Sequence, residues 1–143
     1  MRTTRLLSLA SLLLFLASAA PAQQPTLKPV ATVKQLMKAI VIPSSDAVFQ
    51  VAAKEPKNDE EWAAVQNSAL ALAEAGNLLM IGSRAKDRGE WMKESQALVD
   101  LGAAAFKAAE AKDAEAVAKA GDEIYNVCES CHNKYMEKAK ETK

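Results

Sequence analysis

The residues with the clearest chemistry in this chain are its two cysteines and its single histidine, which stand together at Cys128, Cys131 and His132. On an α-helix, positions i, i+3 and i+4 project from one face. Two thiols and an imidazole at this spacing match Cys-x-x-Cys-His, the attachment signature of a c-type haem. The thiols would form thioethers with the haem vinyl groups, and the histidine would bind the iron. We therefore predict one covalently attached haem per chain, with His132 as its proximal iron ligand.

Three other uses of the two cysteines are weaker. A thioredoxin-like redox pair would need a βαβ setting, and the sequence has no strand pattern. A zinc site would need a fourth ligand, which no further Cys or His supplies, although a carboxylate could complete it. A local disulfide beside an incidental histidine is the remaining alternative. The single histidine also excludes bis-histidine ligation within one chain. The sixth iron position must therefore hold a methionine, another group or nothing.

The start of the chain has the pattern of an export signal. Arg2 and Arg5 precede an almost wholly apolar run from 6 to 20, and Ala20-Pro21-Ala22 supplies a small-x-small cleavage site. The run is too short to span a bilayer comfortably. We predict a cleaved secretory signal peptide at 1–22, a periplasmic mature domain at 23–143, and no membrane attachment after cleavage; the alternative is an anchor that is not cleaved.

The charge of the predicted mature chain limits the kinds of partner it is expected to bind. Removing Arg2 and Arg5 from the 18 basic and 18 acidic residues leaves a net charge of −2. This balance gives no support to nucleic-acid binding. Cysteines only three positions apart cannot staple distant parts of a fold, and a domain of this length can bury a core without disulfides. We therefore expect both cysteines to serve chemistry.

Four helical stretches would position the site. The chain is rich in Ala, Leu, Glu and Lys and lacks strand-like alternation. We predict helices from about 30 to 42, from 58 or 59 to near 82, from about 90 to 111, and from a cap at Asp113 to Met136 or beyond. Pro43 should kink or end the first helix, although the apolar spacing after it indicates that helix resumes. The simplest fold is an all-α antiparallel four-helix bundle around one covalently bound haem c.

The C-terminal motif resembles that of class II cytochromes c, the cytochrome c prime group and its low-spin relatives. In that family the haem motif lies near the C-terminus of a four-helix bundle. The segment Cys128-Glu-Ser-Cys131-His132-Asn-Lys-Tyr135 is similar to the family pattern Cys-x-x-Cys-His-x-x-Tyr. Met136 departs from the pattern, because an Arg usually follows that Tyr. Gly82-Ser83 followed by Trp91 resembles, more loosely, the family's join between its second and third helices.

The resemblance implies that the first helix covers the distal side of the haem. Low-spin members place a Met there in a Leu-Met-Lys context, which Leu36-Met37-Lys38 matches, so Met37 looks like the sixth iron ligand. By spacing alone, Met37 belongs to an apolar stripe with Val33 and Ile40, where a methionine usually just packs.

Other methionines and aromatic residues are rivals or neighbours of this site. Met80 is a second candidate for the distal ligand and Met92 a weaker one, whereas Met136 shares a helix face with His132 and cannot reach across the haem. Tyr135 is expected to pack on the haem or to hydrogen-bond near a propionate, or else to be an ordinary half-buried tyrosine. Trp62 and Trp91 are expected to pack in the core of the bundle or to border the haem. Four lysines make the C-terminal end basic, where they would complement the helix dipole or form a docking patch for an acidic redox partner: Lys134, Lys138, Lys140 and Lys143.

The predicted function is single-electron transfer by a monohaem c-type cytochrome, without enzyme activity. A Met/His haem is coordinatively full, and its thioether ligand favours the ferrous state. The alternative is a five-coordinate haem that binds nitric oxide or carbon monoxide, which the resemblance implies for true cytochromes c prime. A peroxidase-like enzyme is disfavoured because no second His and no obvious distal Arg is present. The expected partners are redox proteins, and a second copy of the chain is a further option because the family often dimerises through its first two helices.

Overall fold

Three of the four helical stretches in the described residues begin at a polar residue whose side chain accepts a hydrogen bond from a free backbone amide of the first turn. The computed structural model describes residues 27–141, with side chains to residue 136, so the predicted signal peptide at 1–22 lies outside the described residues. Thr32 forms a capping box with Gln35, which starts the first helix. Asn58 and Asp113 each accept a hydrogen bond from the amide three positions on, and these caps start the second and fourth helical stretches where predicted.

The described residues fold into helices and contain no strand. The elements in chain order are α2 (Val33–Leu36), the π-helical turn η2 (Met37–Val41), α3 (Ile42–Gln50), α4 (Asp59–Leu79), the 3-10 turn η3 (Gly82–Arg84), α5 (Glu90–Glu110) and α6 (Ala114–Glu141). Because α2, η2 and α3 are continuous, four long helical stretches result, which confirms the all-α prediction. Within the described part of the chain, no helix is both long and apolar enough to cross a membrane.

Pro43 lies inside the first helical stretch and does not end it. A proline has no amide hydrogen, and its ring clashes with the carbonyl four residues earlier in a regular α-helix. Here the π-helical turn precedes Pro43, and the amide of Ile42 donates to the carbonyl of Met37, five residues back. The wider turn shifts the hydrogen-bond register by one residue and accommodates the ring. The prediction that the helix could end at Pro43 is therefore wrong, and the prediction that helix continues beyond it is confirmed.

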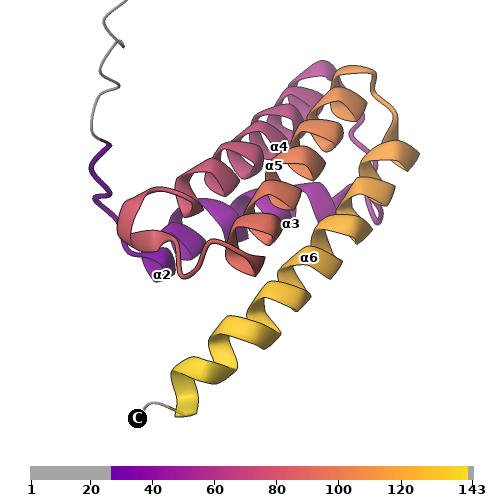
Figure 1. Cartoon of the computed structure of the whole chain (residues 1–143). Coiled ribbons are helices and arrows are strands. Elements are labelled where there is room, and N and C mark those ends of the chain that lie inside the picture. The colour runs from indigo at the N-terminus through magenta and orange to yellow at the C-terminus, as the bar shows by residue number, and fades with distance from the viewer. Residues whose placement is uncertain (1–26, 142–143) are drawn as a thin grey trace, which may run out of the picture.

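The four stretches pack side by side around a shared core (Figure 1). α4 packs against α5, α5 against α6, and α3 against both α4 and α6. The α4–α5 crossing is close: a Cβ atom at Gly76 would lie 2.7 Å from the carbonyl oxygen of Ser95, and one at Gly102 would lie 2.7 Å from the amide nitrogen of Ala73. Glycine is needed at both positions because the backbones meet there. This arrangement is compatible with the predicted four-helix bundle.

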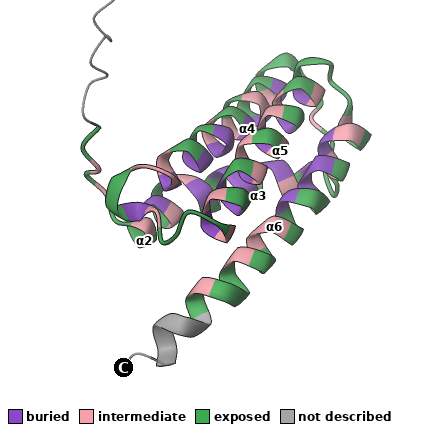
Figure 2. Ribbon diagram, viewed as in Figure 1, coloured by how far each residue is buried: buried purple, intermediate pink, exposed green. Residues whose placement is uncertain are grey.

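The core ends before α6 does. The fully buried side chains with the largest volumes come from α3, α4 and the first half of α6, namely Val48, Leu72, Val117 and Ile124. Figure 2 shows that buried residues line the inner faces of the bundle, whereas the later turns of α6 extend past the other helices and become half-buried or exposed. The Cys-x-x-Cys-His segment therefore lies where α6 leaves the core.

Candidate functional site

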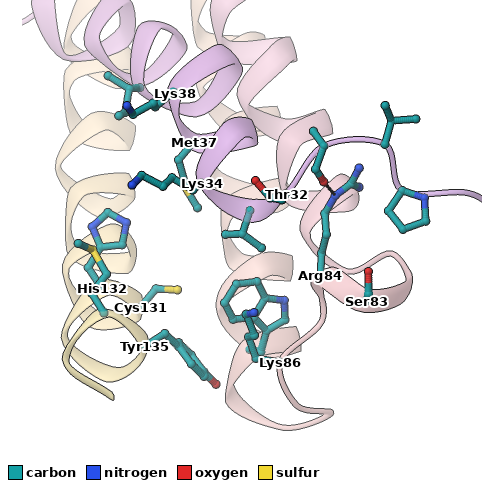
Figure 3. Close-up of a pocket in the computed structure, with 17 residues that line it drawn as sticks. Thr32, Lys34, Met37, Lys38, Ser83, Arg84, Lys86, Cys131, His132 and Tyr135 are labelled. Carbon is teal, nitrogen blue, oxygen red and sulfur yellow. Dashed lines mark hydrogen bonds between the residues drawn. The ribbon is translucent and has the colours of Figure 1, made fainter. Parts of the chain in front are cut away.

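A cavity of about 870 Å³ lies where α6 leaves the bundle. From α6 it is lined by Cys131, His132 and Tyr135, and from the first helical stretch by residues that include Val33 and Met37. Figure 3 shows Met37 and His132 reaching this space from two different helices. Pockets of about 300–1,000 Å³ are the size that holds cofactors and other small ligands. The fold thus brings together two side chains that are far apart in the sequence.

Four of the five predicted site residues line this cavity: Met37, Cys131, His132 and Tyr135. Cys128 does not line it. It lies one turn earlier on α6, half-buried against the edge of the core. Positions three apart share a helix face, so Cys128 remains on the side of α6 from which Cys131 reaches the cavity. Both cysteines are free thiols, so the described structure contains no local disulfide between them.

Burial favours the protonated form of both thiols. Burial raises the pKa of the Cys128 thiol, and burial, helped by the nearby Glu94 and Cys128, raises the pKa of Cys131 to about 11. A redox-active cysteine depends on a lowered pKa, because the thiolate is the nucleophile. The raised values argue against a thioredoxin-like pair. The part of the chain that the structure describes also has no group of three or more His, Cys, Asp or Glu side chains placed to hold a metal ion.

Among the described methionines, Met37 alone faces the cavity of His132 from another helix. Met80 and Met92 line a separate hollow at the connection between α4 and α5. Met136 lines the main cavity, but it lies on the same helix as His132 and its side chain is largely exposed. The structure therefore separates the two rival methionines from the site that Met37 and His132 share.

The wall opposite α6 is held in place by Arg84, a residue that the sequence patterns did not single out. Arg84 is only 7% exposed. Its Nε donates to the carbonyl of Ala31 at 2.9 Å, and its Nη1 donates to the carbonyl of Leu78 at 2.8 Å. Leu78 lies in the last turn of α4, where the partial negative charge of the helix favours a cation. Because Ala31 immediately precedes the Thr32 cap, Arg84 fixes the start of the helix that carries Met37.

Tyr135 links α6 to the start of α5. Its hydroxyl donates to Asp87, and its ring packs edge-on against Trp91 with the ring centres 5.0 Å apart. Asp87 also accepts from the amides of Trp91 and Gly89. The Tyr135 hydrogen bond, followed by the Trp91 amide, lowers the pKa of Asp87. Desolvation, followed by the bond to Asp87, raises the pKa of Tyr135 to about 12. Contact between Tyr135 and a haem stays a prediction.

α5 supplies the remaining support. Trp91 is buried, lines the cavity and donates from Nε1 to the carbonyl of Leu79 at 2.9 Å, so it serves both the core and the cavity wall. Trp62 belongs to the core and does not line the cavity. The hydroxyl of Ser130 donates to the buried Glu94 at 2.8 Å, which ties α6 to α5 next to Cys131.

The roles of Arg84, Asp87 and Glu94 could not be predicted from local sequence patterns. Their contacts to Ala31, Tyr135 and Ser130 join positions that are 36 to 53 residues apart. No local spacing signals such a pair, whereas the Cys-x-x-Cys-His motif is contained in five consecutive residues.

Comparison of the chain with protein-family models, with curated proteins and with solved structures found no match in any of the three.

Proposed function

We propose that this chain is a periplasmic monohaem c-type cytochrome that carries single electrons, and that His132 and Met37 are the residues that would bind its iron. The observation that carries the proposal is the shared cavity: Met37 and the motif residues Cys131 and His132 line the same space from two helices. The resemblance to low-spin class II cytochromes c implies Met37 as the distal ligand, through the segment Leu36-Met37-Lys38. The fold provides independent support, because it places Met37, and neither Met80 nor Met92, in that cavity.

Covalent attachment of the haem would use both cysteines. Each thiol would add across a vinyl double bond, with the sulfur bonding to one carbon and the hydrogen to the other, so no electron is gained or lost. Burial raises the pKa of both thiols, to about 11 for Cys131, and so favours this S–H form. Cys131 lines the cavity and would bond directly to a haem bound there. Cys128 would form the second thioether from one turn earlier on the same face of α6.

The other lining residues would tune the site. A haem held there supplies a one-electron couple between ferric and ferrous iron. The neutral thioether of Met37 favours the ferrous state. Lys34, Lys38 and Lys86 also line the cavity, and nearby positive charge favours the state with one positive charge less. Apolar side chains such as Val33 and Trp91 limit the access of water to the reacting centre.

The absorption spectrum of the reduced holoprotein tests this proposal. The full chain would be produced with its signal and a c-type haem maturation system. We expect haem that stays on the chain after denaturation, a sharp α band, and little change on adding carbon monoxide. A broad high-spin spectrum with ready carbon monoxide binding would instead identify the five-coordinate, gas-binding alternative. A chain that emerges from this system without covalent haem would exclude both.

A further inference from the structure

Charge is distributed unevenly along the bundle. We define the cavity end as residues 27–42, 78–92 and 128–136, which contain the cavity lining and its immediate neighbours. This end has seven basic and three acidic residues, a net charge of +4. The rest of 27–136 has six basic and thirteen acidic residues, a net charge of −7. The cavity end is therefore positive on a domain whose remaining surface is strongly negative.

Of the three acidic residues at the cavity end, Asp87 and Glu90 have local partners, and Glu129 is exposed on α6 and does not line the cavity. Asp87 accepts three hydrogen bonds, from Tyr135, Trp91 and Gly89. Glu90 lies 3.4 Å from the Nζ atom of Lys93 and 4.0 Å from that of Lys134. The local acids thus leave the positive charge of the lysines nearer the cavity uncompensated.

Three lysines stand at the cavity itself. Lys34 and Lys38 come from the first helical stretch, and Lys86 comes from the connection between α4 and α5, on a different part of the lining (Figure 3). All three are exposed, and none forms a salt bridge with a described residue. No described residue that lines the cavity is acidic. The two propionates of a bound haem would offset part of this positive charge without reversing its sign.

We propose that the cavity end is the docking face for an acidic redox partner protein, with Lys34, Lys38 and Lys86 steering that partner to the haem. The proposal rests on the proposed haem function. Complementary charge raises the rate of encounter and suppresses wrong orientations. A partner bound at this end would meet the cavity directly, whereas the acidic remainder of the domain would repel it. Of the predicted patch of C-terminal lysines, Lys134 belongs to this end and lies 4.0 Å from Glu90, whereas the side chains of Lys138, Lys140 and Lys143 lie outside the described residues.

The test compares two small oxidants of opposite charge. The ferrous holoprotein gives one electron to ferricyanide, an anion, or to cobalt(III) tris-phenanthroline, a cation, and each rate is followed over ionic strength. If the cavity end governs the encounter, the rate with ferricyanide falls roughly threefold between low and moderate salt, because the Debye length shortens to about 10 Å at 0.1 M. The rate with the cobalt complex rises. The net charge of −2 would produce the opposite signs, and that result would overturn the proposal.

Matched variants locate the effect. Lys34→Gln/Lys38→Gln/Lys86→Gln removes three charges at the cavity, and Lys54→Gln/Lys57→Gln/Lys119→Gln removes three exposed charges elsewhere. We expect the first variant to abolish or invert the salt dependence with ferricyanide and the second to leave its sign unchanged. Equal effects of the two variants would overturn the proposal. So would a changed haem spectrum in the first variant, because the lysines would then bind the cofactor itself.

A carboxylate-terminated monolayer on gold represents the acidic partner surface. The holoprotein should exchange electrons rapidly with this electrode. The rate of exchange should fall about tenfold further in the cavity variant than in the control variant. Binding through the same lysines to phosphatidylglycerol vesicles, without electron exchange at the carboxylate surface, would assign the face to a membrane and overturn the proposal. Failure of covalent haem attachment, by contrast, would count against the proposed function itself.

Discussion

The two walls of the cavity are specified in different ways. On α6, the groups that would attach and ligate a haem come from residues 128–132, and one turn of helix is enough to place them on one face. On the opposite wall, the place of Met37 depends on the Thr32 cap, the π-helical turn before Pro43 and the long-range hydrogen bonds of Arg84. The α6 wall is therefore a local property of the sequence, and the Met37 wall is a property of the tertiary structure.

Burial follows the same division. The motif lies where α6 leaves the core, and His132 is exposed. Leu36 and Val41, which flank Met37 on the other wall, are 3% and 5% exposed. A side chain that is positioned by packing shifts when its neighbours change, because protein interiors are closely packed. We therefore expect distant substitutions to disturb the Met37 wall and to leave haem attachment on α6 intact.

The largest expected effect is on the α6 wall and requires only the motif. Cys128→Ser/Cys131→Ser removes both thiols, so we expect complete loss of haem that survives denaturation. Of the single variants, Cys131→Ser should lose more attached haem than Cys128→Ser, because Cys131 lines the cavity and Cys128 does not. Haem staining of a denaturing gel measures both results. Ser130→Ala, which breaks only the bond to Glu94, should retain the attached haem.

The next effect breaks the other wall at its proposed ligand. Met37→Ala should keep the haem attached but change it from low spin to high spin, because the thioether is removed while His132 stays. The variant should bind carbon monoxide readily, and its reduction potential should fall on the order of 0.1 V. Met80→Ala is the matched control and should leave spectrum and potential unchanged. An unaltered spectrum in Met37→Ala, with a shift in Met80→Ala, would move the distal ligand to Met80.

A third effect tests whether the Met37 wall depends on a distant residue. Arg84→Met removes two hydrogen bonds from a buried cation and leaves the carbonyls of Ala31 and Leu78 without those partners. Each such bond contributes about 1.5–3 kcal/mol, so the loss of both should lower the free energy of unfolding by roughly 3–6 kcal/mol. A high-spin fraction should appear as the start of the Met37 helix loosens. Arg88→Met, which removes an exposed charge from the same connection, should change neither quantity measurably. Equal losses in both variants would show that Arg84 has no special role.

The same division explains how much the sequence could predict. The caps at Asn58 and Asp113, the four helical stretches and the spacing of Cys131 and His132 follow from local patterns, and the structure reproduces their placement. Pro43 alone predicts a kink or an end of the first helix, whereas the apolar spacing after it correctly predicts that helix resumes. The buried Leu36, Val41 and Val48 hold this stretch against the core on both sides of the proline, and a π-helical turn accommodates it. The contacts of Arg84 and Asp87 have no local signature and required the fold.

The smallest expected effect concerns the bond between Tyr135 and Asp87, which joins α6 to the beginning of α5. Tyr135→Phe keeps the ring against Trp91 and removes the hydroxyl. The haem spectrum should stay unchanged, and the loss of stability at neutral pH should be smaller than in Arg84→Met. Tyr125→Phe, on the same helix, is the matched control because its ring is largely exposed and packs edge-on against Phe49.

The pH dependence of this small effect identifies the bond. The pKa of Tyr135 is raised from 10 to about 12, so its contribution is fully present below pH 10 and is lost as the pH rises towards 12. The pKa of Asp87 is lowered, so its contribution is present above the ordinary value of 3.8 and is lost as the pH falls below it. The difference in unfolding free energy between the parent protein and Tyr135→Phe should therefore shrink at both extremes of pH. Denaturant titrations at pH 3, 7 and 11 would measure it, since a difference that does not vary with pH would mean that the ring alone joins the two helices.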